Sequence, residues 1–247
     1  MTCGKPAAHA RAIAGKDAKA GILADASTTS EQLRPAIGDA APKQNRSTAA
    51  ETRPSRRPVV AVLALQGAFA EHERKLAQAG ADCVELRQRA DLKRPFDALV
   101  LPGGESTAQG KLLRDLGMLE PLRERIIGGL PVLATCAGMI LLAERIAQGD
   151  GPHLATIPMT VRRNAYGRQL ESFRAEGELT GVGRVPMTFI RAPYVEEAGP
   201  GTEVLARVDG RIVAVRCGAQ WALAFHPELD AGCAVHAAFL SAALRPA

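Results

Sequence analysis

The most informative stretch of the chain reads Leu130-Pro131-Val132-Leu133-Ala134-Thr135-Cys136-Ala137-Gly138, and a second apolar segment, Met139–Ala143, follows it. The first part is typical of a buried strand and the second of a helix, so the small residues around Cys136 predict a tight strand-to-helix turn. α/β hydrolases raise their nucleophile above the sheet on such a turn, where the next backbone N–H can bind an oxyanion. A helix N-terminus also favours the thiolate, which is the reactive form of cysteine. The stretch therefore predicts that Cys136 is a nucleophile.

A candidate base and a candidate carboxylate follow far downstream, in Phe225-His226-Pro227-Glu228. In an extended segment, residues two apart point to the same side, so Glu228 is expected to orient His226. A lone cysteine after a strand is more often a small buried hydrophobe, and a lone His-Pro-Glu is mostly a turn. Both elements, however, follow strands at the edge where α/β sheets place their chemistry. Together they supply a nucleophile, a base and an orienting group, and they predict a cysteine hydrolase.

Apolar runs and helical patterns alternate through the chain. The predicted strands are Val59–Leu65, Cys83–Leu86, Asp97–Leu101, the run leading to Cys136, Thr156–Val161, Met187–Ile190, Glu203–Val208, Arg211–Cys217 and Trp221–Phe225. The predicted helices are Ala70–Ala79, Ala108–Leu116, Leu119–Ile127 and Val235–Leu244. This order predicts an α/β fold, with a mainly parallel sheet, helices on both faces and added antiparallel strands. One pair of antiparallel strands is expected to form a hairpin that turns at Asp209-Gly210.

The charge of the chain is unevenly distributed. Residues 1–57 hold 10 Lys or Arg and 5 Asp or Glu, which accounts for the whole net charge of +5. They are rich in Ala, Ser, Thr and Pro and contain no aromatic residue, so they cannot bury enough apolar surface to offset the entropy of ordering. The sequence therefore predicts a disordered N-terminal extension over residues 1–57 and one folded domain over residues 58–247.

Composition excludes several classes of protein. The folded part carries no excess positive charge, which argues against nucleic acid as a partner. No run of about 18 apolar residues occurs, so no membrane span is expected. The five cysteines are odd in number and form no C-x-x-C pair, which argues against a disulfide framework or a zinc site. A reducing, cytoplasmic location is the expectation, and no metal is expected.

The segment Pro102-Gly103-Gly104-Glu105-Ser106-Thr107 follows a predicted strand and opens a predicted helix. Paired glycines let the backbone turn sharply and aim N–H groups at a developing negative charge. It lacks the Gly-Lys-Ser/Thr sequence of a phosphate loop. It fits an oxyanion-hole and substrate-binding loop, although a capped helix start at Ser106 or Thr107 would also explain it.

Two polar segments hold arginines that could recognise a carboxylate bidentately. They are Arg162-Arg163-Asn164-Ala165-Tyr166-Gly167-Arg168-Gln169 and Phe189-Ile190-Arg191-Ala192-Pro193, although single arginines are usually surface solubilisers. The first strand ends in Leu65-Gln66-Gly67, which places an amide at the expected active edge. His72 lies between Glu71 and Glu73, but the trio lacks metal-ligand spacing, so it is interpreted as a polar helix face.

Taken together, these segments resemble one family over about Val59–Leu244. The matching segments, in order, are Leu63–Gly67, Leu101–Thr107, Thr135–Gly138, Arg163–Gln169, Phe189–Pro193 and Phe225–Leu229. The set is similar to the glutaminase subunits of pyridoxal 5′-phosphate synthases, a family of the flavodoxin-like class I glutamine amidotransferases. The Cys and His-Pro-Glu elements mark the superfamily, and the Gly-Gly-Glu-Ser-Thr, Arg-Asn-Ala-Tyr-Gly-Arg-Gln and Ile-Arg-Ala-Pro segments narrow it to this subunit. Ala134 departs from the pattern, because the family often has Gly there.

The resemblance implies a role for each matching residue. Cys136 is the expected nucleophile, His226 the general base and acid, and Glu228 the group that orients His226. The oxyanion hole is expected at the backbone of Ala137 and of the Gly103–Gly104 loop, and Gln66 is expected to sense the partner's surface. The residues expected to hold glutamine are Gly104, Glu105, Ser106, Arg163, Ile190 and Arg191.

The implied reaction is hydrolysis of L-glutamine to L-glutamate and ammonia through a cysteine thioester. The resemblance further implies that the ammonia passes to a separate synthase (lyase) subunit, which makes pyridoxal 5′-phosphate (vitamin B6), and that this subunit switches the glutaminase on. The Gly103–Gly104 peptide is the expected switch, because glycine can rotate an N–H into or out of the oxyanion hole at little steric cost. No bound cofactor is implied. Two alternatives stay open, namely a glutaminase subunit serving another acceptor and a non-catalytic regulatory subunit.

Overall fold

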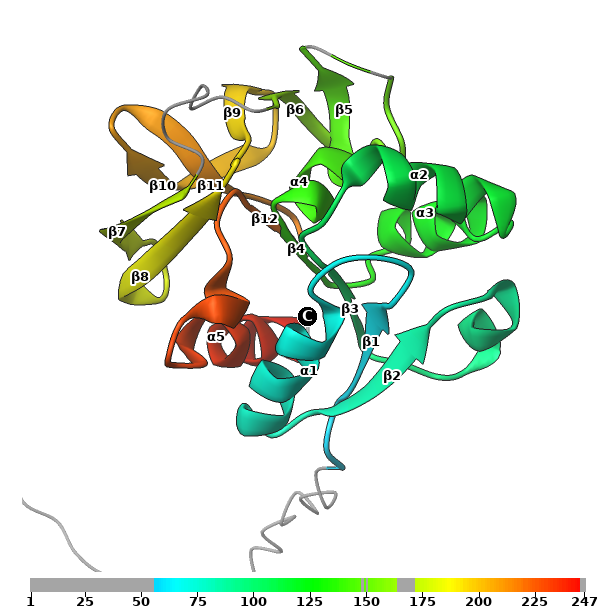
Figure 1. The fold of residues 1–247 in the computed structure, drawn as a ribbon. Coiled ribbons are helices and arrows are strands. Elements are labelled where there is room, and N and C mark those ends of the chain that lie inside the picture. The colour runs from blue at the N-terminus through cyan, green and yellow to red at the C-terminus, as the bar shows by residue number, and fades with distance from the viewer. Residues whose placement is uncertain (1–55, 148, 150, 164–171, 245–247) are drawn as a thin grey trace, which may run out of the picture. The chain divides into compact units, whose positions relative to one another are not determined.

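A computed structural model of the chain describes residues 56–147, 149, 151–163 and 172–244 (Figure 1). The predicted N-terminal extension lies outside the described residues except for Arg56 and Arg57. Arg56 Nη2 donates to Asp97 Oδ1 at 2.5 Å, and Arg57 Nε donates to the Gly80 carbonyl at 3.2 Å. The disorder of residues 1–57 stays a prediction.

The large sheet has the strand order β2-β1-β3-β4-β12-β11-β9-β6-β5, and β10 pairs with β11 outside this path. Its first five strands in space are parallel: β2 (Asp82–Leu86), β1 (Val59–Leu63), β3 (Ala98–Leu101), β4 (Val132–Thr135) and β12 (Gln220–Leu223). The other strands are β5 (Ala143–Ile146), β6 (Ile157–Arg162), β9 (Tyr194–Ala198), β10 (Thr202–Val208) and β11 (Arg211–Cys217). A separate antiparallel pair consists of β7 (Ser172–Leu179) and β8 (Gly183–Ile190).

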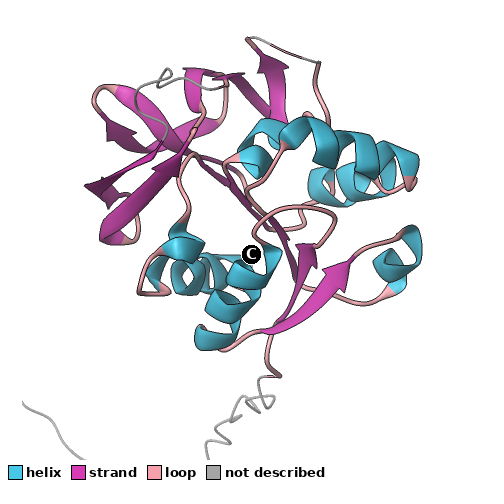
Figure 2. Ribbon diagram, viewed as in Figure 1, coloured by secondary structure: helices cyan, strands magenta, loops and turns pink. Residues whose placement is uncertain are grey.

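Helices cover both faces of the parallel strands (Figure 2). The helices are α1 (Phe69–Gln78), α2 (Ser106–Asp115), α3 (Leu119–Ile127), α4 (Ala137–Leu142) and α5 (Ala234–Ala243), with short 3₁₀ helices η1 (Arg89–Lys93) and η2 (Pro227–Leu229). Helices α1 and α5 pack together on one face, and α2, α3 and α4 lie on the other. Strands β3 and β4 are buried along their whole length, as strands covered on both faces must be. The predicted α/β fold is confirmed.

Beyond β12 the sheet continues through mainly antiparallel strands, and β5 and β6 pair in parallel. The hairpin of β10 and β11 turns at Asp209 and Gly210, whose φ angles are +48° and +76°. Two positive φ angles identify a type I′ turn, which matches the twist of the flanking strands. The predicted hairpin is therefore confirmed.

Three strands are not predicted from the sequence: β5, β7 and β9. The apolar segment after Cys136 was expected to stay helical through Ala143, but α4 ends at Leu142 and Ala143 adopts the extended backbone that begins β5. Strand β7 alternates between exposed and half-buried residues, because it pairs only with β8. Neither segment carries a long apolar run, so neither stands out as a strand.

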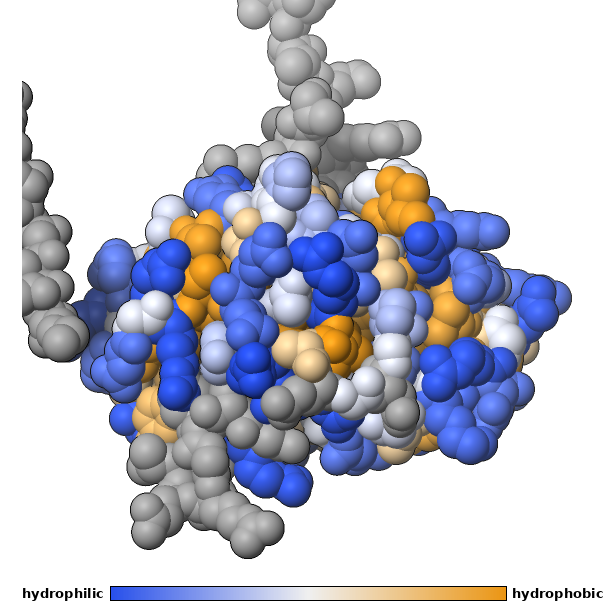
Figure 3. All heavy atoms as spheres, turned by 90° about the horizontal axis from the view of Figure 1, so that it is seen from above, coloured by the Kyte–Doolittle hydropathy of each residue, from blue (hydrophilic) through white to orange (hydrophobic). Residues whose placement is uncertain are grey.

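The face of the domain that is seen from above in Figure 3 is mainly hydrophilic. Seen from above, polar residues cover most of the face, and apolar residues form small groups between them (Figure 3). Among the described residues, no helix is long and apolar enough to cross a membrane.

Candidate active site

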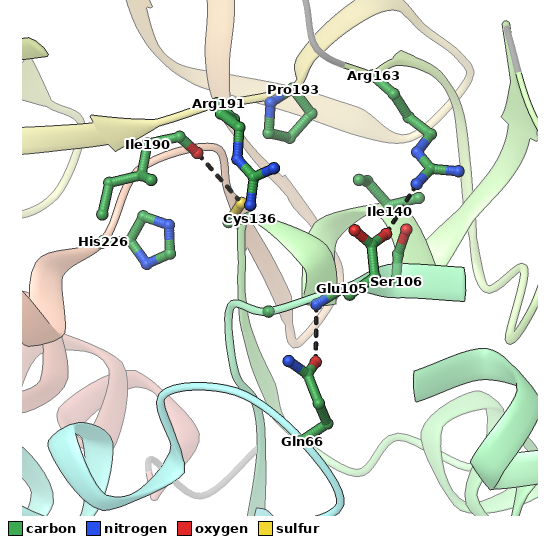
Figure 4. A pocket seen from close by; sticks show the side chains of 11 residues that line it. Gln66, Glu105, Ser106, Cys136, Ile140, Arg163, Ile190, Arg191, Pro193 and His226 are labelled. Carbon is green, nitrogen blue, oxygen red and sulfur yellow. Dashed lines mark hydrogen bonds and ion pairs between the residues drawn. The ribbon is translucent and has the colours of Figure 1, made fainter. Parts of the chain in front are cut away.

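A cavity of about 270 Å³ lies at the carboxyl ends of the central parallel strands (Figure 4). Parallel strands bring the residues that follow them to one edge, so Gln66, Gly104, Cys136 and His226 converge from β1, β3, β4 and β12. The lining residues are Gln66, Gly104, Glu105, Ser106, Cys136, Ile140, Arg163, Ile190, Arg191, Pro193 and His226. The structure thus brings all six of the predicted glutamine-binding residues to one cavity with the predicted nucleophile and base.

Cys136 occupies the predicted turn between β4 and α4. Its backbone has φ +47° and ψ −100°, a conformation that costs a non-glycine residue about 1–3 kcal/mol. The turn is held by the Cys136 N–H, which donates to the Leu223 carbonyl of β12 at 2.8 Å. Gly138 is required two residues later, because a Cβ there would lie 2.1 Å from the Leu101 carbonyl oxygen. The strained turn presents a thiol that is 8% exposed to the cavity.

His226 and Glu228 form a short hydrogen bond. His226 Nδ1 lies 2.6 Å from Glu228 Oε1, and both side chains are buried. The extended segment predicted here is wrong, because Pro227 starts the 3₁₀ helix η2 directly after His226. The predicted contact nevertheless forms. The backbone N–H of His226 donates to the Thr188 carbonyl at 2.8 Å, which fixes the start of this segment. The 3₁₀ helix η2 then turns Glu228 back toward the imidazole.

The electrostatics of this pair favour a charged imidazole. Burial opposes the imidazolium of His226, but hydrogen bonds and charge interactions with Cys136 and Glu228 outweigh it and raise the pKa of His226 to about 10. Burial likewise opposes the carboxylate of Glu228, yet His72 and His226 together hold its pKa below the ordinary value. The raised pKa favours the imidazolium of His226 at neutral pH, with Nδ1 hydrogen-bonded to Glu228.

The predicted oxyanion loop is fastened to the turn before α1. The Gly103 carbonyl accepts the Ala68 N–H at 3.0 Å, and the Glu105 N–H donates to Gln66 Oε1 at 2.7 Å. In a trans peptide the C=O and N–H point in opposite directions, so the Gly104 N–H faces away from Ala68. Close packing also requires Gly67, which has φ +105° and whose added Cβ would lie 1.9 Å from the Gly103 oxygen.

Two arginines reach the cavity, as predicted. Arg163 Nη2 pairs with Glu105 Oε1 at 2.9 Å, and its Nη1 donates to Thr107 Oγ1 at 3.2 Å. Arg191, with a positive φ of +43°, extends from the end of β8 toward Cys136 (Figure 4). The rest of the first arginine segment, residues 164–169, lies outside the described residues.

Two residues at the back of the site were missed by the sequence analysis. His72 was interpreted as part of a polar helix face, and this is wrong: its side chain is fully buried, with Nε2 3.4 Å from Glu228 Oε2. Behind it, His236 of α5 is also fully buried, with Nε2 3.0 Å from His72 Nδ1. Helical spacing was the available signal, because His72 lies four residues before the buried Leu76 and so shares its face of α1.

The described residues contain no group of three or more His, Cys, Asp or Glu side chains arranged to hold a metal ion.

The chain shares its fold and much of its sequence with known proteins. A crystal structure titled as a glutamine amidotransferase superposes with a TM-score of 0.71 at 44% identity, covering 74% of this chain and 98% of that one. The "Pyridoxal 5′-phosphate synthase subunit PdxT" of Desulfitobacterium hafniense is 58% identical over 181 residues, which are 73% of this chain and 91% of the relative. The protein of the same name from Streptococcus pneumoniae is 51% identical over 185 residues, 74% of this chain and 96% of the relative.

The chain is a glutamine amidotransferase by its fold and site. The features that define this class here are the thiol on a strained strand-to-helix turn, the buried His–Glu pair, the sheet covered on both faces and the structural match. More narrowly, residues 62–244 match the sequence model of the SNO glutamine amidotransferase family, and the chain belongs to that family.

Proposed function

We propose that this chain hydrolyses L-glutamine at Cys136 and supplies the ammonia to the lyase subunit of a pyridoxal 5′-phosphate synthase. One observation carries the proposal: Cys136 and His226 face a single cavity, with Glu228 hydrogen-bonded behind His226. The names of the relatives, each a subunit of pyridoxal 5′-phosphate synthase, support the second half of the proposal.

The cavity offers complementary charges to an amino acid. Free glutamine carries an α-ammonium and an α-carboxylate, and Glu105 and Arg163 stand 2.9 Å apart at the cavity wall. We assign Glu105 to the ammonium and Arg163 to the carboxylate, because a guanidinium binds a carboxylate bidentately. Gly104, Ser106, Ile190 and Arg191 complete the site. The γ-carboxamide then extends toward Cys136.

Acylation starts from the Cys136 thiolate beside the His226 imidazolium. The thiolate attacks the carboxamide carbon, and the carbonyl oxygen becomes an oxyanion bound by the N–H groups of Ala137 and Gly104. Loss of one such donor costs about 2.7–4 kcal/mol in the transition state. His226 then protonates the departing nitrogen, so ammonia leaves and a γ-glutamyl thioester remains.

Deacylation uses the same groups in the opposite sense. His226, now neutral, removes a proton from water, and the hydroxide attacks the thioester carbon. The second tetrahedral intermediate collapses to glutamate and restores the Cys136 thiolate and the His226 imidazolium. Throughout, Glu228 holds the imidazole with Nδ1 toward itself, which leaves Nε2 for the reaction.

The test uses the full chain together with its synthase subunit and glutamine labelled with ¹⁵N in the amide. We expect the label in pyridoxal 5′-phosphate and an equal yield of glutamate. Cys136→Ala should abolish both, because the nucleophile is gone while Ala nearly fills its place, and added ammonium salt should restore the synthase reaction. Cys217→Ala, which alters a half-buried cysteine on β11, serves as the control and should change neither yield.

Glutaminase activity in pure Cys136→Ala would overturn the assignment of the nucleophile. Glutamate formation without label in the product would instead point to another ammonia acceptor.

A further inference from the structure

The contact with His226 provides a hydrogen bond to only one of the two carboxylate oxygens of Glu228. Its Oε1 takes the 2.6 Å contact from His226 Nδ1, but its Oε2 is buried and makes no hydrogen bond of good geometry among the described residues. His72 Nε2 lies 3.4 Å from this oxygen. A buried carboxylate oxygen needs a donor to keep its charge, so this contact bears directly on the state of the catalytic pair.

His72 contacts both the strand that leads to Cys136 and the carboxylate of Glu228, on the side away from the cavity. Its Nε2 is 3.1 Å from Thr135 Oγ1, the residue before the nucleophile, and also faces Glu228. Its Nδ1 is 3.0 Å from His236 Nε2, and the two rings are tilted by 55°. His72 does not line the cavity, so it acts on the reaction only through other residues.

Burial favours the neutral form of both histidines. Burial lowers the pKa of His72 despite the opposing charge of Glu228, with His226 lowering it further and Glu71 raising it. Burial lowers the pKa of His236 to about 3, and the neighbouring His72 and Lys75 act in the same direction. The charge of Glu228 opposes this shift. A neutral imidazole has one N–H and one acceptor nitrogen, so each ring must exist as one of two tautomers.

The contacts select one tautomer for each ring. If His72 carried its proton on Nδ1, His236 Nε2 would accept it, and the His236 proton would lie on Nδ1, a buried atom without a hydrogen-bond partner. An orphaned buried N–H is costly, and Glu228 would face a lone pair. With both protons on Nε2, His236 donates to His72 and His72 donates toward Glu228 and Thr135, leaving only an acceptor nitrogen unpaired.

We propose that His72 is a positioning residue for glutamine hydrolysis, held by His236 in the Nε2–H tautomer so that it keeps Glu228 ionised and turned toward His226. The proposal rests on the catalytic roles proposed above for Glu228 and His226. It assigns a task to two buried histidines that the reaction scheme itself does not use.

Lys75, on the same helix as His72, supports this arrangement. Lys75, one turn after His72 on α1, donates from Nζ to the carbonyls of Asp230 and Ala231, which directly follow η2. Helix α1 therefore fixes the segment that carries Glu228 at two points, once through its backbone and once through its carboxylate.

The test compares two substitutions at position 72 in the full chain assayed with its synthase subunit. His72→Leu removes the donor, whereas His72→Gln retains an N–H near the Nε2 position. For His72→Leu we expect kcat to fall roughly 10- to 100-fold, the worth of one hydrogen bond to a charged group, with KM for glutamine unchanged. His72→Gln should recover most of this loss. His153→Leu removes another buried histidine, at the far side of α2, and serves as the control.

The pH profile separates positioning from a general loss of structure. Without the donor, the pKa of Glu228 rises and its support for the His226 imidazolium weakens. The acid limb of kcat/KM in His72→Leu should therefore move to higher pH and the alkaline limb to lower pH, while both limbs stay in place in His72→Gln. The titratable groups facing the pair are Glu228, His226, Glu71 and Lys75, and all are retained in both variants.

A second readout does not depend on activity or on a folded variant. NMR of the wild-type chain labelled with ¹⁵N-histidine should show His72 and His236 as neutral, Nε2-protonated rings at pH 7. An Nδ1-protonated or cationic His72, or a folded His72→Leu with the kcat and pH limbs of the wild type, would overturn the proposal. Failure of the proposed function is recognised separately, because Cys136→Ala would then retain glutaminase activity.

Discussion

At the scale of single residues, the site depends on how burial divides charge among three histidines. The partners of His226 raise its pKa and favour the imidazolium, whereas burial lowers the pKa of His72 and of His236 and favours their neutral forms. All three side chains nevertheless lie in one chain of contacts. In the proposed reaction, the first carries the proton that is given to the departing nitrogen. The other two supply directed N–H groups without adding a charge that would compete for Glu228.

Stability in acid should report the neutral state of His236. Its pKa is about 3 in the folded chain and near 6.5 when unfolded, so between these values the unfolded chain binds a proton that the folded chain does not. The free energy of unfolding should therefore fall as the pH drops below 6.5, by about 1.4 kcal/mol per pH unit for this group.

Urea unfolding of the wild type and of His236→Gln at pH 6.5, 5.5 and 4.5 measures this dependence. The variant cannot take up that proton, so its unfolding free energy should fall less steeply with acid. Equal slopes for the two proteins would mean that His236 is already charged in the folded state.

At the scale of elements, the turn before α1 and the loop after β3 act as one unit. The Gly103 oxygen is held by the Ala68 N–H and the Glu105 N–H by the Gln66 side chain, so neither segment can move without the other. On its opposite side the loop packs against the catalytic imidazole, because a Cβ on Gly103 would lie 2.3 Å from His226 Cε1.

Gly103→Ala should therefore displace His226. A displacement of about 1 Å in a catalytic group costs on the order of 100-fold in rate, so we expect kcat to fall by about that factor, with little change in the unfolding midpoint. Steady-state glutaminase assays with the synthase subunit and thermal unfolding provide the two measurements. Gly151→Ala is the control, because a Cβ there meets no atom within 4 Å. A wild-type kcat for Gly103→Ala would show that the imidazole tolerates the methyl group.

The sequence predicts the elements that have a strong local signal. Strands β1, β3 and β4 are runs of buried apolar residues, and the turns at Cys136 and Asp209-Gly210 use small or turn-forming residues. Strand β9 is missed because Glu196 and Glu197 interrupt its apolar pattern and its pairing is set by distant strands. His72 is missed for a similar reason: its glutamate neighbours suggest an exposed face, and only tertiary packing against α5 and η2 reveals that it is buried.

At the scale of the whole molecule, the proposed oxyanion loop is linked to the protein surface. The Gly103–Gly104 peptide is anchored to a surface turn that contains Gln66, which is itself half exposed. A partner that docks on this turn could therefore reorient the Gly104 N–H of the proposed oxyanion hole without contacting Cys136.

The isolated chain should accordingly hydrolyse glutamine slowly and be activated by its synthase subunit. One oxyanion donor is worth about 100- to 1,000-fold in rate, which sets the scale of the expected activation. Glutamate production by the chain alone and with the synthase subunit measures it. Equal rates in both conditions would rule out the switch and favour a stand-alone glutaminase.

The N-terminal residues should be dispensable. A chain starting at Pro58 loses only the exposed contacts of Arg56 and Arg57 among those described, and exposed ion pairs are worth about 0–1 kcal/mol each. We expect full activity with the synthase subunit and a small drop in unfolding free energy. A chain starting at Ser55 keeps both arginines and is the matched control. Loss of folding or of partner binding in both truncated chains would assign a structural role to residues 1–54.

The position of β12 has a consequence for the synthesis of the protein. This strand comes late in the chain, yet it lies between β4 and β11 in the middle of the sheet and holds the Cys136 turn through the Leu223 carbonyl. A chain emerging from the ribosome thus exposes Cys136 long before β12, His226 and Glu228 exist. Until then the thiol has neither its fixed turn nor its base. The nascent chain therefore carries an ordinary cysteine at this position, and the proposed catalytic arrangement arises only in the finished domain.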